Sequence, residues 1–113
     1  MTAVTIGIAS LDDAMKRARG AFSGKPQGSF ISFASHEIMQ KTLTPKRWEL
    51  VKSMAGASPM SIREAARRVS RDVKSVHGDV QALLKAGVIE KNENGLIVFP
   101  FDEIHVDFVL RAA

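Results

Sequence analysis

Residues 58–100 read SPMSIREAARRVSRDVKSVHGDVQALLKAGVIEKNENGLIVFP. Over most of this stretch the apolar residues recur every three or four positions, which is the spacing of helices. Its last part has two short apolar runs on either side of a turn sequence, as in a β-hairpin. The stretch therefore predicts two helices followed by a hairpin.

The first helix is expected to begin at Ser61, whose side-chain oxygen can accept a hydrogen bond from a free N–H of the first turn. Glu64, three residues on, completes the sequence of a capping box. The apolar positions that follow have helical spacing: Ile62, Ala65, Ala66 and Val69. Three arginines lie off that stripe: Arg63, Arg67 and Arg68. We expect the helix to end near Val69.

The second helix is expected between Asp72, a capping residue, and Gly87, the residue type favoured just beyond a helix end. Its apolar positions are Val73, Val76, Val80, Leu83 and Leu84. Only Ser70 and Arg71 separate the two helices, which is too short for an antiparallel pair and fits the corner of a helix-turn-helix. The outer face of the second helix then holds Lys74, Ser75, His77, Gly78 and Gln81.

The hairpin is expected to pair residues 88–91 with residues 96–99 across the turn Asn92-Glu93-Asn94-Gly95. Asn-Gly is a strong hairpin signal because both residues tolerate positive φ. A helix-turn-helix followed by such a hairpin predicts a winged helix over residues 44–100, with the hairpin as the wing. The wing carries Glu93 and little positive charge, so we expect its tip to add little affinity.

These residues predict three kinds of DNA contact. The backbone amides at the Ser61 end and three arginines are expected to hold phosphates: Arg63, Arg67 and Arg71. Side chains of the second helix are expected to read bases in the major groove: Lys74, Ser75, His77 and Gln81. The hairpin, with Lys91 and Asn94, is expected along the adjacent backbone or minor groove. For His77, simple exposure or a contact within the domain is the alternative.

Charge favours the same segment. Residues 44–91 contain ten Lys or Arg residues against five Asp or Glu residues, whereas residues 92–113 contain one against four. The positive charge is therefore concentrated where DNA would lie. A winged helix that only binds proteins, with its arginines as a solvated face, remains the alternative.

Gly78 is unusual within this pattern. A glycine inside an exposed helix costs roughly 1 kcal/mol relative to alanine. It therefore predicts close approach of the backbone, either to DNA or to a helix packed against it.

The composition agrees with one small regulatory unit. The chain has 113 residues, which fits a single domain or a winged helix with a dimerisation appendage. It has no cysteine, which excludes disulfides and thiolate zinc sites. No apolar run approaches the roughly 20 residues needed to span a bilayer, and no signal-peptide pattern is present, so we expect a cytoplasmic protein. A pI of about 9.8 favours a polyanionic partner.

Enzymatic interpretations find little support. Glu103, His105 and Asp107 alternate on one face of an expected strand and could in principle bind a metal, but a solvated face is the simpler explanation. The loop Gly24-Lys25-Pro26 lacks the spaced glycines and the Lys-Ser/Thr pair of a phosphate-binding loop. We therefore expect no catalytic residues, no cofactor and no metal.

Residues 1–43 predict a strand-helix-strand element. Val4, Ile6 and Ile8 alternate as in a strand, a helix capped by Ser10 follows as far as Phe22, and residues 29–34 have the composition of a second strand. A short helix over residues 35–43 then leads to one opened by Thr44 and Pro45. Trp48 on that helix is most simply a core anchor.

Residues 101–113 predict a C-terminal strand, because Ile104, Val106, Phe108 and Leu110 alternate with polar residues. This strand and the two N-terminal strands could form a common sheet, which would be a marginal module alone. We therefore expect a homodimer that pairs through these terminal elements and presents two recognition helices to two half-sites.

Several segments resemble a known family in the same order along the chain: LTPKRWELV (43–51), SIREAARRV (61–69), RDVKSVHGDVQALLKAGVIEK (71–91) and FPFDEIHVDFVL (99–110). They are similar to the winged-helix transcriptional regulators of bacteria and archaea that are often encoded beside a toxin gene, with the TumA-type antitoxins as the closest group. The predicted helices and strands together make an α+β protein. The resemblance implies that it represses its own operon and binds a cognate ribonuclease-like toxin. The acidic-faced tail and the N-terminal element are the candidate toxin-binding surfaces.

Overall fold

The computed structural model describes residues 2–8 and 29–107, and shows an α+β protein. The elements follow one another as β1 (Ala3–Ile8), β2 (Ser29–Phe33), α2 (His36–Thr42), α3 (Pro45–Met54), α4 (Ile62–Arg68), α5 (Val73–Lys85), β3 (Glu90–Lys91), β4 (Ile97–Val98) and β5 (Glu103–Asp107). The helix expected between Ser10 and Phe22, and the tail beyond Asp107, lie outside the described residues.

One sheet joins the two ends of the chain. Its strand order is β2-β1-β5, and both pairings are parallel. Ile6 on the central strand lies between Ile31 and Val106 on the two neighbours. The expectation that the N-terminal strands and the tail share a sheet is therefore confirmed.

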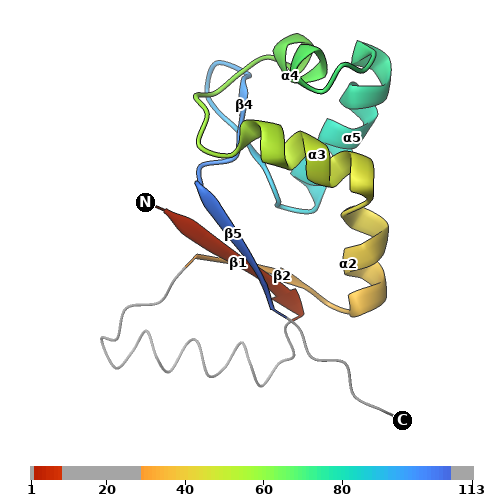
Figure 1. Ribbon diagram of the computed structural model, residues 1–113, viewed down its shortest axis with the longest axis vertical. Helices are drawn as coiled ribbons and strands as arrows, with labels where there is room; N and C mark the ends of the chain where they lie inside the picture. Colours follow the sequence, from red (N-terminus) through yellow and green to blue (C-terminus); the bar gives the residue numbers. More distant parts are fainter. Residues whose placement is uncertain (1, 9–28, 108–113) are drawn as a thin grey trace.

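The sheet and the helices share one hydrophobic core. Val4 and Ile6 of β1 are fully buried, and the same cluster continues through Leu50 of α3 and Leu83 of α5 to Ile97 of the hairpin. Trp48 is only partly buried and packs against the edge of this cluster. Figure 1 shows the sheet at one end of the molecule, and α4, the start of α5 and the hairpin at the other end.

Gly7 allows β1 and β5 to approach each other. A Cβ atom added at Gly7 would collide with the backbone oxygen of Asp107, and would also lie 3.2 Å from the ring of Phe30. Any side chain at this position would therefore push the paired strands apart.

The second sheet is the small hairpin β3–β4, with Lys91 opposite Ile97. A third backbone segment joins it at Met60, which exchanges two hydrogen bonds with Ile97, at 2.9 and 2.8 Å. Met60 directly precedes Ser61, the N-cap of α4, so the bridge connects the start of that helix to the hairpin.

The hairpin turn differs in detail from the expected one. Asn92 organises it: its backbone oxygen accepts from Gly95 N–H, and its side-chain oxygen accepts from the N–H groups of Asn94 and Leu96, each at 3.0 Å. Gly95, with φ 78°, is the one residue of this turn with positive φ. The strands are also shorter than expected, and the N–H groups of Gly87 and Val88 instead close the end of α5 by donating to Leu84 O and Leu83 O.

Within the described residues, no helix has the length and apolar character needed to cross a membrane.

Candidate nucleic-acid interface

In the corner between α4 and α5, two backbone hydrogen bonds close the C-terminal end of α4. Ser70 N–H donates to Arg67 O at 3.2 Å, and Arg71 N–H donates to Ala66 O at 3.0 Å. This pair of bonds is a Schellman motif, which requires a left-handed residue just beyond the helix. Ser70 takes that conformation, with φ 54°. The corner fixes the direction in which α5 leaves α4.

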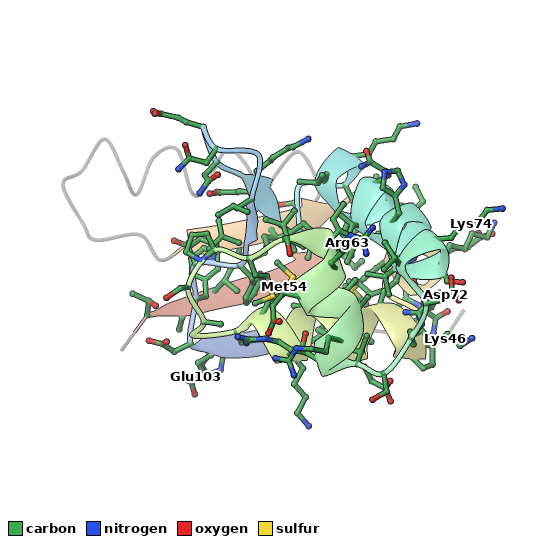
Figure 2. The ribbon with its side chains drawn as sticks, turned by 90° about the horizontal axis from the view of Figure 1, so that it is seen from above. Lys46, Met54, Arg63, Asp72, Lys74 and Glu103 are labelled. Carbon is green, nitrogen blue, oxygen red and sulfur yellow. The ribbon has the colours of Figure 1, made fainter. Side chains whose placement is uncertain are left out.

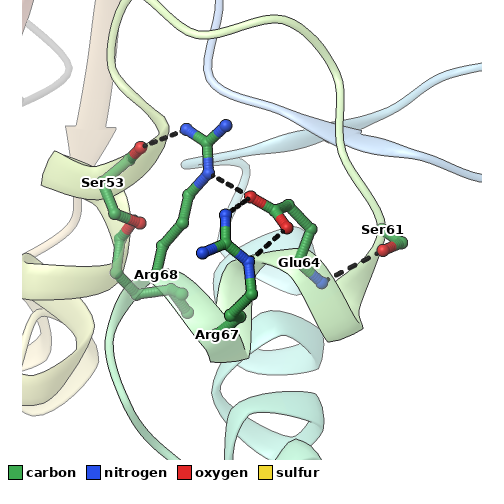
Figure 3. A network of polar contacts seen from close by, with 6 residues as sticks. Ser53, Ser61, Glu64, Arg67 and Arg68 are labelled. Carbon is green, nitrogen blue, oxygen red and sulfur yellow. Dashed lines mark hydrogen bonds and ion pairs between the residues drawn. The ribbon is translucent and has the colours of Figure 1, made fainter.

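The N-terminus of α4 is capped as the sequence predicts, because Ser61 Oγ accepts from Glu64 N–H at 3.1 Å. The Glu64 side chain, however, does not complete the capping box. Its carboxylate accepts two hydrogen bonds from Arg67, at 2.8 and 2.5 Å, and one from Arg68 at 2.8 Å. Arg68 also donates to Ser53 O at 3.4 Å (Figure 3).

This cluster changes the electrostatics of α4. The hydrogen bond from Arg67, together with the one from Arg68, lowers the pKa of Glu64 from 4.5 to about 2. Glu64 therefore stays ionised and offsets part of the positive charge beside it. Arg67 still has 72% of its side chain exposed. Arg63 is exposed and makes no hydrogen bond or ion pair with any described residue.

Arg71 was expected to contact phosphate, but its side chain is largely buried and bound to a carboxylate. Its guanidinium donates to Asp79 Oδ2 at 2.7 Å, and only 17% of its side chain is exposed. Arg47 on α3 donates to the other oxygen, Asp79 Oδ1, at 3.0 Å, and also to Thr42 O at 3.1 Å. The three charged groups therefore form an Arg47–Asp79–Arg71 triad that joins α3, the corner and α5.

The triad keeps Asp79 ionised. Burial of its carboxyl raises the pKa, but the hydrogen bonds from Arg71 and Arg47 outweigh that effect, and the net shift is downward. The sequence does not reveal this contact, since Arg47 and Asp79 are far apart along the chain and each resembles an ordinary surface charge.

The N-terminus of α5 is capped by Asp72, as expected. Asp72 Oδ1 accepts from Ser75 N–H, and Asp72 Oδ2 accepts from the Ser75 hydroxyl, both at 2.8 Å. The backbone hydrogen bond from Ser75, followed by that from its hydroxyl, lowers the pKa of Asp72. The Ser75 hydroxyl proton is thus used inside the cap, and its oxygen remains available as an acceptor.

The two faces of α5 differ sharply. Val76, Val80 and Leu83 are fully buried. Val73, expected on the same apolar stripe, is 40% exposed, because it lies in the first turn at the open end of the helix. The opposite face exposes the residues predicted for base reading: Lys74, Ser75, His77 and Gln81, with Gly78 among them. The side chains of Lys74, His77 and Gln81 make no hydrogen bond or ion pair with described residues.

The hairpin residues Lys91 and Asn94 are also exposed. The Asn94 N–H is used within the turn, and its side chain is free of hydrogen bonds to described residues. A further cation, which the sequence did not single out, is Lys46 in the first turn of α3. It is exposed, and Figure 2 shows it on the same side of the molecule as Asp72 and Lys74.

The residues of β5 that could in principle bind a metal, Glu103, His105 and Asp107, do not form a metal site. His105 Nε2 lies 3.4 Å from Glu103 Oε1, and both side chains are about half exposed. Among the residues in the described ranges, no group of three or more His, Cys, Asp or Glu residues is arranged to hold a metal ion.

Comparison with known proteins gives one family. A family model described as HVO_A0114 matches residues 42–106. No curated protein matches the chain. One similar solved structure is described as "The structure of a protein with unknown function from Listeria innocua Clip11262", with a TM-score of 0.46 and 17% sequence identity. The alignment covers 79% of this chain and 62% of that chain, less than two-thirds of the neighbour's length.

Proposed function

The chain belongs to the HVO_A0114 family, and we propose that it is a sequence-specific DNA-binding transcriptional regulator. In this proposal residues 44–100 form a winged helix-turn-helix. The helix α5 is the recognition helix, and β3, β4 and the Met60 bridge form the wing.

One observation carries the proposal: the outer face of α5 has donors and acceptors that have no partner among the described residues. Lys74, His77 and Gln81 are exposed and unpaired among the described residues. Amide, imidazole and ammonium groups are suited to the base edges in the major groove. The Schellman corner joins this helix to α4 and the triad joins it to α3, and both contacts leave its outer face open to a partner.

The polar residues have three different roles in this mechanism. Arg63 and Arg67 on α4, Lys46 on α3 and Lys91 on the hairpin neutralise phosphates. Arg71, paired with Asp79, instead orients α5 from inside the protein. Lys74, His77 and Gln81 read bases, with the Ser75 oxygen as a further acceptor.

The test is a binding titration with the duplex upstream of the coding sequence and a scrambled duplex of equal length, at several salt concentrations. For roughly four neutralised phosphates we expect log K to fall with log salt with a slope of about −3 to −4. Gln81→Ala should cost about 1–3 kcal/mol on the upstream duplex and little on the scrambled one. Arg63→Ala should weaken binding to both and lower the slope by about one.

Weak binding that is equal for both duplexes would contradict the proposal. It would favour a winged helix that serves only as a protein-interaction module.

The resemblance to TumA-type antitoxins adds two further parts to the proposal: repression of the chain's own operon, and binding of a toxin encoded beside it. A gel shift of the upstream duplex, with and without the product of the neighbouring gene, tests both parts. A stable complex with that product should change the mobility of the shifted band. An unchanged band at saturating neighbour protein would remove the toxin from the proposal.

A further inference from the structure

Gly78 has no structural reason to be glycine within the described part of the protein. It lies inside α5 and is exposed, and no described atom comes within 4 Å of a Cβ atom built there, apart from its chain neighbours and the helix's own nearby backbone. The described glycines with positive φ are Gly56, Gly87 and Gly95, so Gly78 is not needed for a turn. Glycine in a helix is destabilising relative to alanine. The alternative that another helix packs against Gly78 is not realised by any described helix.

The position of Gly78 on the helix is informative. Lys74, Gly78 and Gln81 are separated by four and three residues, so they lie along one line on the surface of α5. His77 lies beside that line. The glycine is therefore a notch in the middle of the polar face, bordered by Lys74, His77 and Gln81, whose side chains have no partner in residues 2–8 and 29–107.

The width of the DNA major groove explains how a missing side chain at Gly78 could matter. The major groove is about 12 Å wide, and a helix with its side chains is about 10–12 Å across, so a recognition helix enters with little clearance. A side chain at the centre of the inserted face would hold the helix axis away from the base pairs. The reach of Gln81 and His77 is short, and a hydrogen bond is lost within a few tenths of an ångström beyond about 3.2 Å.

We propose that Gly78 is the point of closest approach between the backbone of α5 and the base-pair edges, and that its missing side chain determines sequence specificity. The inference rests on the proposed function, since it requires α5 to enter the major groove. Gly78 acts by seating the helix deeply enough for Gln81 and His77 to reach the bases. Phosphate contacts by long, flexible side chains tolerate a small displacement of the helix, and base contacts do not.

The experiment uses the full chain and duplexes that the wild-type protein selects from a random-sequence library. Dissociation constants are measured for a selected duplex and for a scrambled duplex of the same composition, with wild type, Gly78→Ala and Gly78→Leu. We expect Gly78→Ala to raise the melting temperature and to weaken binding to the selected duplex about tenfold, the usual scale of an overpacked contact. Gly78→Leu should weaken it further. Binding to the scrambled duplex should change less than about twofold.

Gln40→Ala is the matched control. It changes an exposed, uncharged side chain in α2 and should leave both dissociation constants unchanged. Two results would overturn the inference: selectivity retained in Gly78→Ala, or equal losses on the selected and scrambled duplexes. A lower melting temperature for Gly78→Ala would also overturn it, because the methyl group would then be filling space needed inside the protein. Failure of the proposed function gives a different result, namely that wild type selects no sequence from the library.

Discussion

At the scale of single residues, two helix ends of the same kind are closed by different residues. The end of α5 has Gly87 at φ 78°, and the end of α4 has Ser70 at φ 54°. Both positions have the Schellman pair of hydrogen bonds. For an L-residue the left-handed conformation costs about 1–2 kcal/mol, and glycine avoids that cost. The corner between α4 and α5 is therefore the more strained of the two.

We expect Ser70→Gly to raise the free energy of unfolding by about 0.5–1 kcal/mol, since part of the gain is offset by the greater freedom of glycine in the unfolded chain. The matched change in the other direction is Gly87→Ala, which should lower it by about 1 kcal/mol. Urea denaturation at neutral pH measures both. Changes of the same sign in the two variants would contradict this account of the corner.

The triad gives a second prediction for a single residue. Asp79→Ala leaves Arg47 and Arg71 without their anion, with only 23% and 17% of their side chains exposed. Removing one partner of a buried ion pair costs about 3–5 kcal/mol. Because these groups retain some contact with water, we expect a loss of about 2–3 kcal/mol in the free energy of unfolding.

The control for Asp79→Ala is Glu37→Ala, which breaks the ion pair between Glu37 and Lys41. Those side chains are 76% and 75% exposed, so the loss should stay below about 0.5 kcal/mol. Denaturation curves of the two variants make the comparison. Similar losses would mean that the triad is no stronger than a surface pair.

At the scale of elements, α4 has an ionised glutamate in its first turn. Glu64 has a pKa of about 2 in the folded protein, below the ordinary value of 4.5, because Arg67 and Arg68 bind its carboxylate. A group with a lowered folded pKa adds stability above its unfolded pKa, and that stability disappears as the pH falls through the folded pKa. The relevant window is therefore from about pH 4.5 down to about pH 2.

We expect the wild type to be more stable than Glu64→Gln by a constant amount above about pH 5. The difference should shrink steadily between pH 4.5 and pH 2, because only the wild-type side chain takes up a proton there. Thermal melts of both proteins across this range provide the measurement. A difference that stays constant down to pH 2 would show that charge at Glu64 contributes nothing to α4.

At the scale of the whole molecule, the β2-β1-β5 sheet and the helices are parts of one core, so they should unfold together. Gly7→Ala tests this cooperativity by destabilising the sheet, where Gly7 lies on β1. The added methyl group collides with the backbone of β5 and should cost about 1–3 kcal/mol.

Trp48, the only tryptophan in the chain, reports on α3, whereas far-UV circular dichroism reports on all helices and strands. The two signals should give the same denaturation midpoint in wild type, and the same lowered midpoint in Gly7→Ala. Separate midpoints would mean that the sheet and the helical part are independent units.

Much of the local structure could be predicted from the sequence. The caps at Ser61 and Asp72, the glycine end at Gly87 and the exposed polar face of α5 were all expected, and the structure confirms them. Each depends on residues within about four positions of one another. Their energies are set by the backbone and the nearest side chains, which the sequence lists side by side.

The tertiary structure decided the roles of the charged residues and the pairing of the strands. Arg71 resembles Arg63 in the sequence, but Arg71 is largely buried and pairs with Asp79, whereas Arg63 remains exposed. The order β2-β1-β5 likewise joins strands from opposite ends of the chain. Such contacts form between residues that are distant along the chain, so their strength depends on burial and geometry that exist only after folding. The sequence by itself determined where these helices begin and end, because caps depend on neighbouring residues. Tertiary packing determined which arginine and lysine side chains are exposed and which are paired inside the protein.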